Sequence, residues 1–225
     1  MNEIHSTVII DSRVSLGTGN KILPYTILQG PLEIGCDNII GPHVVIGSPG
    51  QDTRNPRYDS SNKKIFIGSN NIIREFTAIQ KPVYEDITSL GSNIYLMQSV
   101  HIPHDAILED NVVITPMASI AGIVRLLEGC NVGLGVQIHQ RSVVGQFAIV
   151  GMGATVLKNV KPFSRFVPRS PLSVNIYAIQ KFGFTEYTDE ISKYVLEKIE
   201  PHSEKLLSII HHYRDYHKLS GRQEY

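Results

Sequence analysis

Large aliphatic residues recur every six positions along most of the chain, with small or polar residues between them. An α-helix would repeat its apolar positions every three or four residues, and a half-buried strand would repeat them every two. A period of six is instead typical of a short strand followed by a turn, repeated many times. The aliphatic residues in register are Ile4, Ile10, Leu16, Ile22, Leu28, Ile34, Ile40, Ile46, Ile67, Ile73, Ile79, Leu90, Leu96, Ile102, Leu108, Ile114, Ile120, Leu126, Val132, Ile138, Val144, Val150 and Val156.

Three such units close a triangular coil, which is the hexapeptide class of parallel β-helix. Each coil takes 18 residues, and successive coils stack at about 4.7–4.9 Å, the spacing of paired strands. Residues 18 apart therefore lie nearly above one another, and the aliphatic columns fill the interior of the prism. Glycine often follows the aliphatic residue, as at Gly35 and Gly68, which suits a tight corner. The pattern predicts an all-β solenoid domain over residues 1–160.

Two interruptions of the period predict loops that leave the corners of the solenoid. The first, residues 48–64, is rich in proline, glycine, arginine and asparagine, and the second covers residues 81–89. Loops on a rigid scaffold commonly carry binding residues, although a plain surface loop is the alternative for both.

The period ends after Val156, and the pattern changes. The basic, proline-rich segment 158–171 is typical of a linker that leaves the last coil. Beyond it, the apolar spacing predicts helices over 174–181, from Thr188 to about Ile199, and in a last segment opened by Pro201 and Ser203. We therefore expect a C-terminal linker and a small α-helical domain over residues 161–225.

Charge and cysteine content narrow the function classes. Lysine plus arginine equals aspartate plus glutamate at 21 each, so no overall field attracts nucleic acid or an anionic membrane. Cys36 and Cys130 have no metal-ligand spacing and are expected to be reduced thiols. The N-terminus has no signal-peptide pattern, and no apolar run reaches the length of a membrane helix. We expect a cytoplasmic protein without membrane insertion.

The best candidate for chemistry is the repeat segment that holds His101, His104 and Asp105. At 18 residues per coil, His104, Gly122 and Gln140 form a column at one edge of the prism, with His139 beside it. An imidazole base, a glycine N–H that meets an oxyanion, and a polar amide are the parts of a reaction centre. The neighbouring carboxylate of Asp105 would hold the imidazole in one tautomer. A solvated turn histidine is the alternative.

A zinc site is the main rival for these histidines. His101, His104 and His139 would supply three imidazoles, as in the β-helical carbonic anhydrases, whose sites lie between subunits. Those enzymes place their ligands on adjacent coils, whereas His139 is about two coils away from His104, roughly 9–10 Å by the strand spacing. We therefore expect no metal. A non-catalytic trimeric scaffold is a third possibility.

Several motifs together resemble the acyl-carrier-protein-dependent UDP-N-acetylglucosamine O-acyltransferases of lipid A biosynthesis. The resemblance covers nearly the whole chain and implies a left-handed β-helix with a helical C-terminal domain. It also implies a homotrimer whose active sites lie in clefts between subunits. The motifs are G-S-P-G-Q-D at 47–52, N-I-I-R-E at 71–75, G-S-N-I-Y-L-M at 91–97, H-I-P-H-D at 101–105, A-G at 121–122, H-Q at 139–140, and V-N-I followed by G-F within 174–184.

The resemblance also implies roles for individual residues. His104 would be the general base, Asp105 would orient it, and the Gly122 N–H would stabilise the oxyanion as the acceptor attacks the acyl thioester. The residues implied in substrate binding are His101, His139, Gln140, Gln51, Asp52, Arg54 and Met97.

The donor implied by the family is a phosphopantetheine thioester, on acyl carrier protein or coenzyme A, and no cofactor is bound permanently. A basic set near the tail suits phosphopantetheine or the acidic face of a carrier, with a solvated linker as the alternative. This set is Lys158, Lys161, Arg165, Arg169 and Lys181.

Some positions depart from the family pattern. Ile123 stands where the family has histidine, the segment 168–170 is shortened, and Lys181 and Phe182 replace paired arginines. Each change falls on acceptor or carrier recognition, and none falls on the expected base. We therefore expect acyl transfer to a hydroxyl or amine of a sugar nucleotide or related small acceptor.

Overall fold

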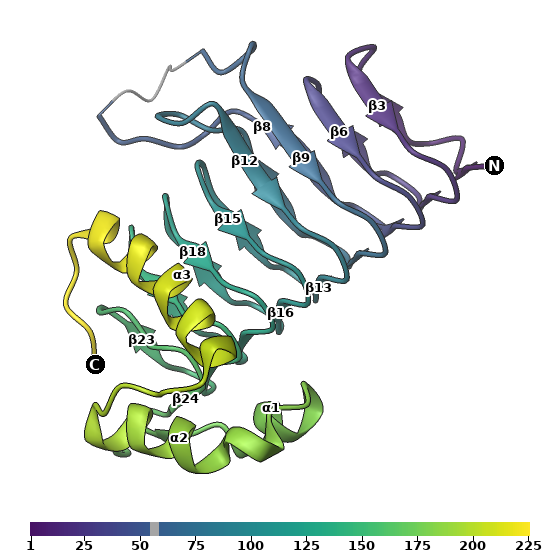
Figure 1. Ribbon diagram of the computed structural model, residues 1–225. Helices are drawn as coiled ribbons and strands as arrows, with labels where there is room; N and C mark the ends of the chain where they lie inside the picture. The colour runs from purple at the N-terminus through teal and green to yellow at the C-terminus, as the bar shows by residue number, and fades with distance from the viewer. Residues whose placement is uncertain (55–58) are drawn as a thin grey trace.

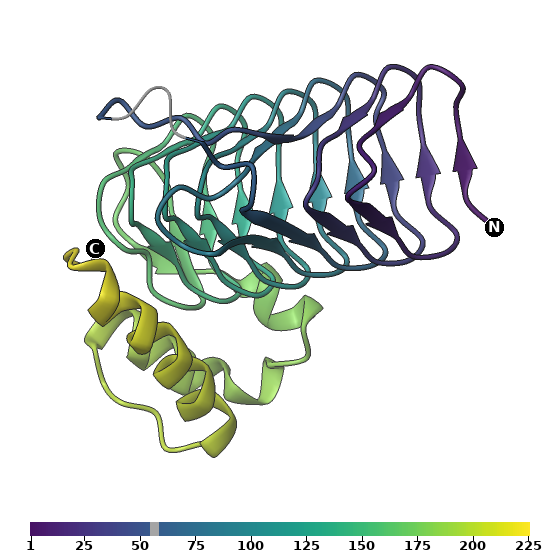
Figure 2. The ribbon, with the colours of Figure 1, turned by 90° about the horizontal axis from the view of Figure 1, so that it is seen from above.

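The chain winds through three sheets that form the sides of a prism (Figure 1), as seen in the computed structural model, which describes residues 1–54 and 59–225. Each sheet takes every third strand of the repeat, and neighbouring strands are parallel except for the last pair of the first sheet. Seen from above, the coils follow one another along a single axis (Figure 2). The architecture is a parallel β-helix.

The sheets contain ten, eight and seven strands. The first sheet contains β1 (Glu3–Ile4), β4 (Lys21–Ile22), β7 (Ile39–Ile40), β10 (Ile72–Ile73), β13 (Tyr95–Leu96), β16 (Val113–Ile114), β19 (Asn131–Val132), β22 (Ile149–Val150), β24 (Ser164–Phe166) and β25 (Ser173–Val174). The second contains β2 (Ile9–Ile10), β5 (Ile27–Leu28), β8 (Val45–Ser48), β11 (Ala78–Gln80), β14 (His101–Ile102), β17 (Ser119–Ile120), β20 (Gln137–Ile138) and β23 (Thr155–Val156). The third contains β3 (Val14–Leu16), β6 (Leu32–Ile34), β9 (Lys64–Ile67), β12 (Ile87–Leu90), β15 (Ile107–Leu108), β18 (Arg125–Leu126) and β21 (Val143–Val144).

The stacking predicted from the period is confirmed. Every aliphatic residue of the repeat lies in a strand, and Leu96, Ile114 and Val132, each 18 residues from the next, are register partners in the first sheet. All three are completely buried in the prism interior. Burying one such side chain stabilises the fold by about 1.5–3 kcal/mol.

The N-terminal end of the prism is open. Ile4 and Ile10, in the first coil, are 44% and 38% exposed, whereas Ile22 in the second coil is 1% exposed. No earlier coil covers the first one within the described residues, so the repeat alone does not bury a side chain at this end.

Gly35 and Gly68, which follow aliphatic residues of the repeat, have a different role from the expected corner. Gly35 and Gly68 do not adopt positive φ angles. A Cβ atom added to Gly35 would instead lie 2.8 Å from the carbonyl oxygen of Gly68 in the next coil. Close approach of stacked backbones therefore requires glycine here, and the left-handed turn residues lie further along each edge.

Both interruptions leave the prism at the same edge. The first lies between β8 and β9 and the second between β11 and β12, so each joins the second sheet to the third. Residues 55–58 of the predicted loop 48–64 lie outside the described residues. We call this corner the His104 edge, because His104 follows β14 at the same passage between sheets.

The predicted linker is partly wrong. Within 158–171, β24 pairs with β22 and extends the first sheet past residue 160. Helix α1 (Ile176–Lys181) begins later than predicted because Val174 pairs with Ser164, and the Asn175 side chain then caps the helix. The remaining helical elements are η1 (Thr185–Tyr187), α2 (Thr188–Ser192), the π-helical η2 (Lys193–Glu197) and α3 (Glu204–Ser220).

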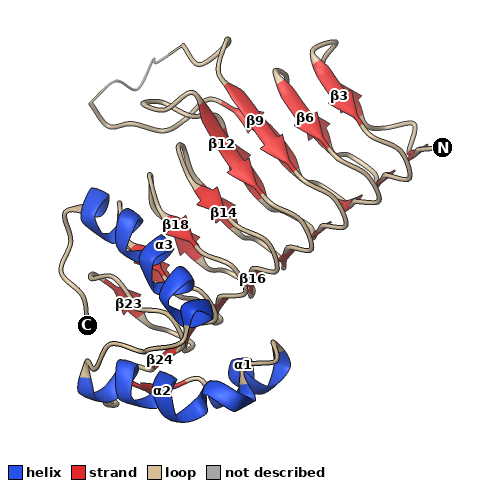
Figure 3. Cartoon of the chain, in the orientation of Figure 1, coloured by secondary structure: helices blue, strands red, loops and turns tan. Residues whose placement is uncertain are grey.

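The helices gather at the end of the prism away from the N-terminus (Figure 3). Helix α3 folds back along the third sheet (Figure 1). The fully buried Tyr213 of this helix packs with Leu127 and Val143. Among the described residues, none of the helices has both the length and the apolar character needed to cross a bilayer.

Candidate active site

The column predicted at one edge of the prism is confirmed by backbone hydrogen bonds. The Ile123 N–H donates to the His104 carbonyl oxygen at 3.1 Å, and the Arg141 N–H donates to the Gly122 carbonyl oxygen at 3.0 Å. His104, Gly122 and Gln140 are therefore stacked on successive coils of the His104 edge.

His104 and Asp105 form a buried pair. The His104 Nδ1 atom lies 2.6 Å from the Asp105 Oδ2 atom, and the residues are 6% and 0% exposed. Asp105 has a φ of 60°, in the left-handed region, which turns its carboxylate back towards the preceding imidazole. Because an ionised carboxylate only accepts hydrogen bonds, Nδ1 carries the proton and Nε2 presents a lone pair.

The second insertion is folded around the Asp105 carboxylate. Its oxygens accept hydrogen bonds from the backbone N–H groups of Val83, Tyr84 and Glu85 at 2.8–3.2 Å. The Asp105 N–H donates to the Thr88 hydroxyl at 3.0 Å. Several donors thus fix the carboxylate, so it can orient the imidazole.

Gly122 lies against the imidazole ring. A Cβ atom at this position would overlap the Cε1 and Nε2 atoms of His104. The Gly122 N–H donates to no acceptor within the residues that the structure describes. A glycine here leaves room for the ring, and its N–H remains available to a ligand.

A cleft of about 340 Å³ opens over this pair of groups. The first insertion supplies one wall, including the predicted Gln51, Asp52 and Arg54. The backbone N–H of Arg54, helped by its guanidinium, holds the pKa of Asp52 below its usual range. The other lining residues are Thr53, Tyr84, His104, Ala121, Gly122, Gln140 and Arg141.

Tyr84 connects the two insertions. Its hydroxyl donates a hydrogen bond to the Asp52 carboxylate, and the Arg54 guanidinium lies 5.1 Å from the centre of its ring. The ring also meets the imidazole of His104 edge-on, with centroids 5.8 Å apart. The sequence did not predict this residue, because it lies in a non-repeating segment with no motif of its own.

No family model matches the chain. The acyl-[acyl-carrier-protein]–UDP-N-acetylglucosamine O-acyltransferase of Herminiimonas arsenicoxydans is 31% identical over 208 residues, which cover 82% of this chain and 78% of that protein. The enzyme of the same name from Saccharophagus degradans is 30% identical, over 86% of this chain and 81% of that protein. The chain belongs to this acyltransferase family. It is therefore an enzyme of acyl transfer.

The fold agrees with solved structures. The UDP-N-acetylglucosamine acyltransferase of Bacteroides fragilis matches with a TM-score of 0.83 and 23% identity, over 99% of both chains. This likeness extends through the C-terminal helices, and it concerns the fold alone.

Three of the binding residues expected for this acyltransferase lie outside the cleft. His101 is half-buried in β14, where burial and then the nearby His104 lower its pKa. His139 lines a separate groove of about 280 Å³ on the second sheet. Met97 follows β13, so it lies at the edge between the first and second sheets.

The C-terminus reaches the edge of the candidate site through Arg222, which the sequence did not predict. Its Nε donates to the Gln140 carbonyl oxygen at 2.6 Å, its Nη1 donates to the Leu157 carbonyl oxygen at 2.7 Å, and its Nη2 contacts the His139 Nδ1 atom. The C-terminus therefore engages Nδ1 of the His139 ring. Among the described residues, no three metal-ligating side chains are placed to hold an ion.

The five basic residues expected to contact the donor differ in burial: one is buried and four are exposed. Lys161 is 2% exposed and donates to the Tyr194 carbonyl oxygen at 3.3 Å, and burial lowers its pKa. It therefore does not belong to an exposed basic surface. The exposed members are Lys158, Arg165, Arg169 and Lys181.

Proposed function

We propose that this acyltransferase moves an acyl group from a phosphopantetheine thioester to a hydroxyl or amine of a sugar nucleotide or related small acceptor. The observation that carries the proposal is the His104–Asp105 pair, 2.6 Å apart, whose imidazole packs against Gly122, a residue with an unpaired N–H among the described residues. A base and an oxyanion donor at one point are what thioester acyl transfer requires. UDP-N-acetylglucosamine, on which the named relatives act, is the first acceptor to test.

The reaction proceeds in two steps at these groups. His104 Nε2 takes the proton of the acceptor as its oxygen or nitrogen attacks the thioester carbonyl carbon. The resulting oxyanion accepts a hydrogen bond from the Gly122 N–H. The carbon–sulfur bond then breaks, and the leaving thiolate takes the proton back from the imidazolium. Asp105 stabilises that imidazolium and keeps its ring orientation.

Side chains of the cleft would hold the acceptor. Gln140 makes no side-chain hydrogen bond to any described residue, so its amide is available to a ligand. Gln51, Asp52 and Arg54 face the same space, and we assign all four to acceptor binding. His101 and His139, on the outer face nearby, are proposed to contact the thioester arm.

We propose acyl carrier protein as the principal donor, with coenzyme A as the alternative source of the same thioester. The exposed Lys158, Arg165, Arg169 and Lys181 would meet the phosphate of phosphopantetheine or an acidic carrier surface. No permanently bound cofactor takes part in the proposed chemistry.

A homotrimer of left-handed prisms is part of the proposal. An exposed apolar stripe on the edge between the first and second sheets supports it, because such a stripe marks an interaction surface. Met97 lies on this edge and would reach an active site only from a neighbouring copy. The stripe consists of Tyr25, Phe76, Met117, Leu134 and Met152, which are 50–73% exposed.

We further propose a transferase domain over 1–160, a C-terminal domain over 161–225 and a cytoplasmic location. Both cysteines, Cys36 and Cys130, are unpaired thiols, which suits a reducing compartment.

Mass-spectrometric detection of acylated product tests the proposal. Purified protein would be incubated with acyl carrier protein loaded with chains of several lengths, or with acyl coenzyme A, and with UDP-sugars and amines. His104→Ala is expected to lower turnover by roughly 10²-fold or more. The exposed His5, in the first coil, gives the matched control His5→Ala, which should retain full turnover. Full activity of His104→Ala would overturn the role of the base.

A further inference from the structure

A second cavity, of about 210 Å³, adjoins the cleft on the side of helix α3. It lies between the His104 edge and the last turn of α3, and it shares Arg141 with the cleft. Ile123, the residue after Gly122, also lines it. A group bound in this cavity would therefore lie next to the atoms proposed to react.

Two arginines face this cavity from successive coils. Arg125 belongs to β18, where its register partner in the next coil is Val143, and Arg141 precedes Val143 by two residues. The two coils are about 4.7–4.9 Å apart along the prism axis, the parallel-strand spacing. Burial lowers the pKa of Arg125, the nearby Glu85, Tyr216 and Asp105 oppose this shift, and the like charge of Arg141 adds a smaller lowering. The two guanidiniums thus border the same small space.

Neither guanidinium forms an ion pair with a carboxylate of the described residues. Arg125 Nη1 donates to the Asp105 carbonyl oxygen at 2.5 Å, but its Nε and Nη2 atoms donate to no described residue. The Arg141 guanidinium has no hydrogen bond or ion pair in the described part of the chain. Glu85 is the one carboxylate among the described residues that line the cavity, and this residue is exposed.

Only one of the two cations is withdrawn from water, because Arg125 is half-buried and Arg141 is exposed. A partly buried cation loses hydration and is normally compensated by an ion pair or by full hydrogen bonding. The Arg125 guanidinium lies 6.0 Å from the centre of the Tyr216 ring, which compensates it in part. Within the described lining, two arginines face one exposed carboxylate, so the lining carries a net positive charge. Tyr216 also lines the cavity, and its hydroxyl makes no hydrogen bond to a described residue.

We propose that Arg125 and Arg141 form a phosphate-binding site for the acceptor, which specifies an acceptor with a phosphate near its nucleophile. This proposal rests on the proposed acyl transfer for the identity of the ligand, but not for the existence of the site. The planar guanidinium fork matches two phosphate oxygens, and a phosphate dianion balances both cations. Arg141 faces both spaces, so it would hold the phosphate while the rest of the acceptor occupies the cleft.

Calorimetric titration of the full-length protein with pyrophosphate and inorganic phosphate tests the site without any acyl donor. We expect Arg141→Gln and Arg125→Gln each to weaken pyrophosphate binding about tenfold, as loss of a charge-assisted pair predicts. Arg141→Lys keeps the charge but loses the fork, and an intermediate affinity is expected. Acetate serves as a third titrant, and tight acetate binding would assign the site to carboxylates instead.

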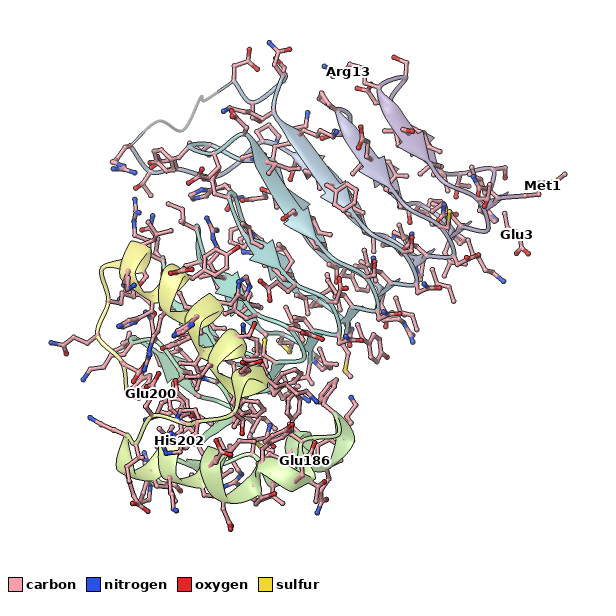
Figure 4. All side chains as sticks on the ribbon, in the orientation of Figure 1. Met1, Glu3, Arg13, Glu186, Glu200 and His202 are labelled. Atoms are coloured by element: carbon pink, nitrogen blue, oxygen red, sulfur yellow. The ribbon has the colours of Figure 1, made fainter. Side chains whose placement is uncertain are left out.

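Arg13 provides the matched control, because it lies at the N-terminal end of the prism (Figure 4) and its guanidinium pairs with the Asp11 carboxylate at 3.1 Å. Arg13→Gln removes one charge from the protein and should leave pyrophosphate affinity unchanged. Since Arg125 also contacts Asp105, a thermal melt identifies any variant that fails to fold, and Arg141→Gln, at an exposed residue, then decides the question. Equal pyrophosphate affinity of wild type and Arg141→Gln would overturn the site.

The experiments distinguish failure of the proposed acyl transfer from failure of the proposed phosphate site. If the protein binds pyrophosphate through these arginines but transfers no acyl group, the proposed function is wrong and the anion site stands. If His104-dependent transfer occurs but Arg141→Gln leaves both pyrophosphate affinity and the KM for the acceptor unchanged, the site is wrong and the proposed function stands.

Discussion

The imidazole of His104 is oriented by its own neighbour in sequence, because the left-handed backbone at Asp105 brings Oδ2 to 2.6 Å from Nδ1. Because the two residues are adjacent in one turn, the distance between Nδ1 and Oδ2 depends little on other elements. The orientation of the Asp105 carboxylate depends on the second insertion, whose backbone N–H groups donate to it.

Asp105→Asn should impair His104 as the general base while the protein still folds. An amide can present N–H to the ring, which favours the wrong imidazole tautomer, so kcat should fall roughly 10²–10⁴-fold. Loss of charged hydrogen bonds to the insertion should also lower the free energy of unfolding by about 1–3 kcal/mol. Steady-state kinetics and urea unfolding measure the two effects.

Asp37 offers a matched control for that change. It has a φ of 58°, close to that of Asp105, but no histidine beside it. Asp37→Asn should leave kcat unchanged. Equal kcat for wild type and Asp105→Asn would contradict the orienting role.

Gly122→Ala and Gly135→Ala should have opposite effects, the first on kcat and the second on stability. The new methyl group would displace the His104 ring, so kcat should fall about 100-fold or more, the contribution expected of a positioned base. In contrast, Gly135 has a φ of 64° and open space around an added Cβ atom. Gly135→Ala should therefore cost about 1 kcal/mol of stability with no loss of kcat. The reverse pattern in kinetics and thermal melts would refute the placement of the ring against Gly122.

Tyr84→Phe should affect acceptor binding more than chemistry. It removes the hydroxyl that donates to Asp52 but keeps the ring beside His104. Loss of a hydrogen bond to a charged group predicts a rise of about tenfold in the KM for the acceptor, with kcat nearly constant. Tyr177→Phe, at an exposed position of α1, is the control. An unchanged acceptor KM would show that the contact does not shape the cleft.

His101 should make the protein less stable in acid. Burial holds its pKa in the folded state below the value of about 6.5 that it regains on unfolding. The unfolded chain therefore binds more protons as the pH falls through about 6.5, so the free energy of unfolding decreases there. His101→Asn should flatten this decrease, measured by urea unfolding at several pH values. The same substitution at the exposed His5 should leave the slope unchanged, and an unaltered slope for His101→Asn would contradict the prediction.

The repeat determined most of what the sequence could predict. Once the period placed His104 and Gly122 on one column, their contact followed from coil geometry and needed no other information. Tyr84 and Arg222 were not predictable in this way, because non-repeating segments carry them to the site. The prediction for Lys161 was wrong for a related reason. Its charge suggested an exposed position, whereas the helical segment covers it.

The two ends of the prism differ in how well their strands are covered. Among the described residues, strands β1, β2 and β3 each have a strand partner on one side only, whereas helices and the C-terminal residues cover the other end. Opening should therefore start at the first coil and advance towards the helices, so amide hydrogen exchange would be graded along the axis. The first coils should therefore open and exchange their amide protons while the coils that form the cleft remain folded.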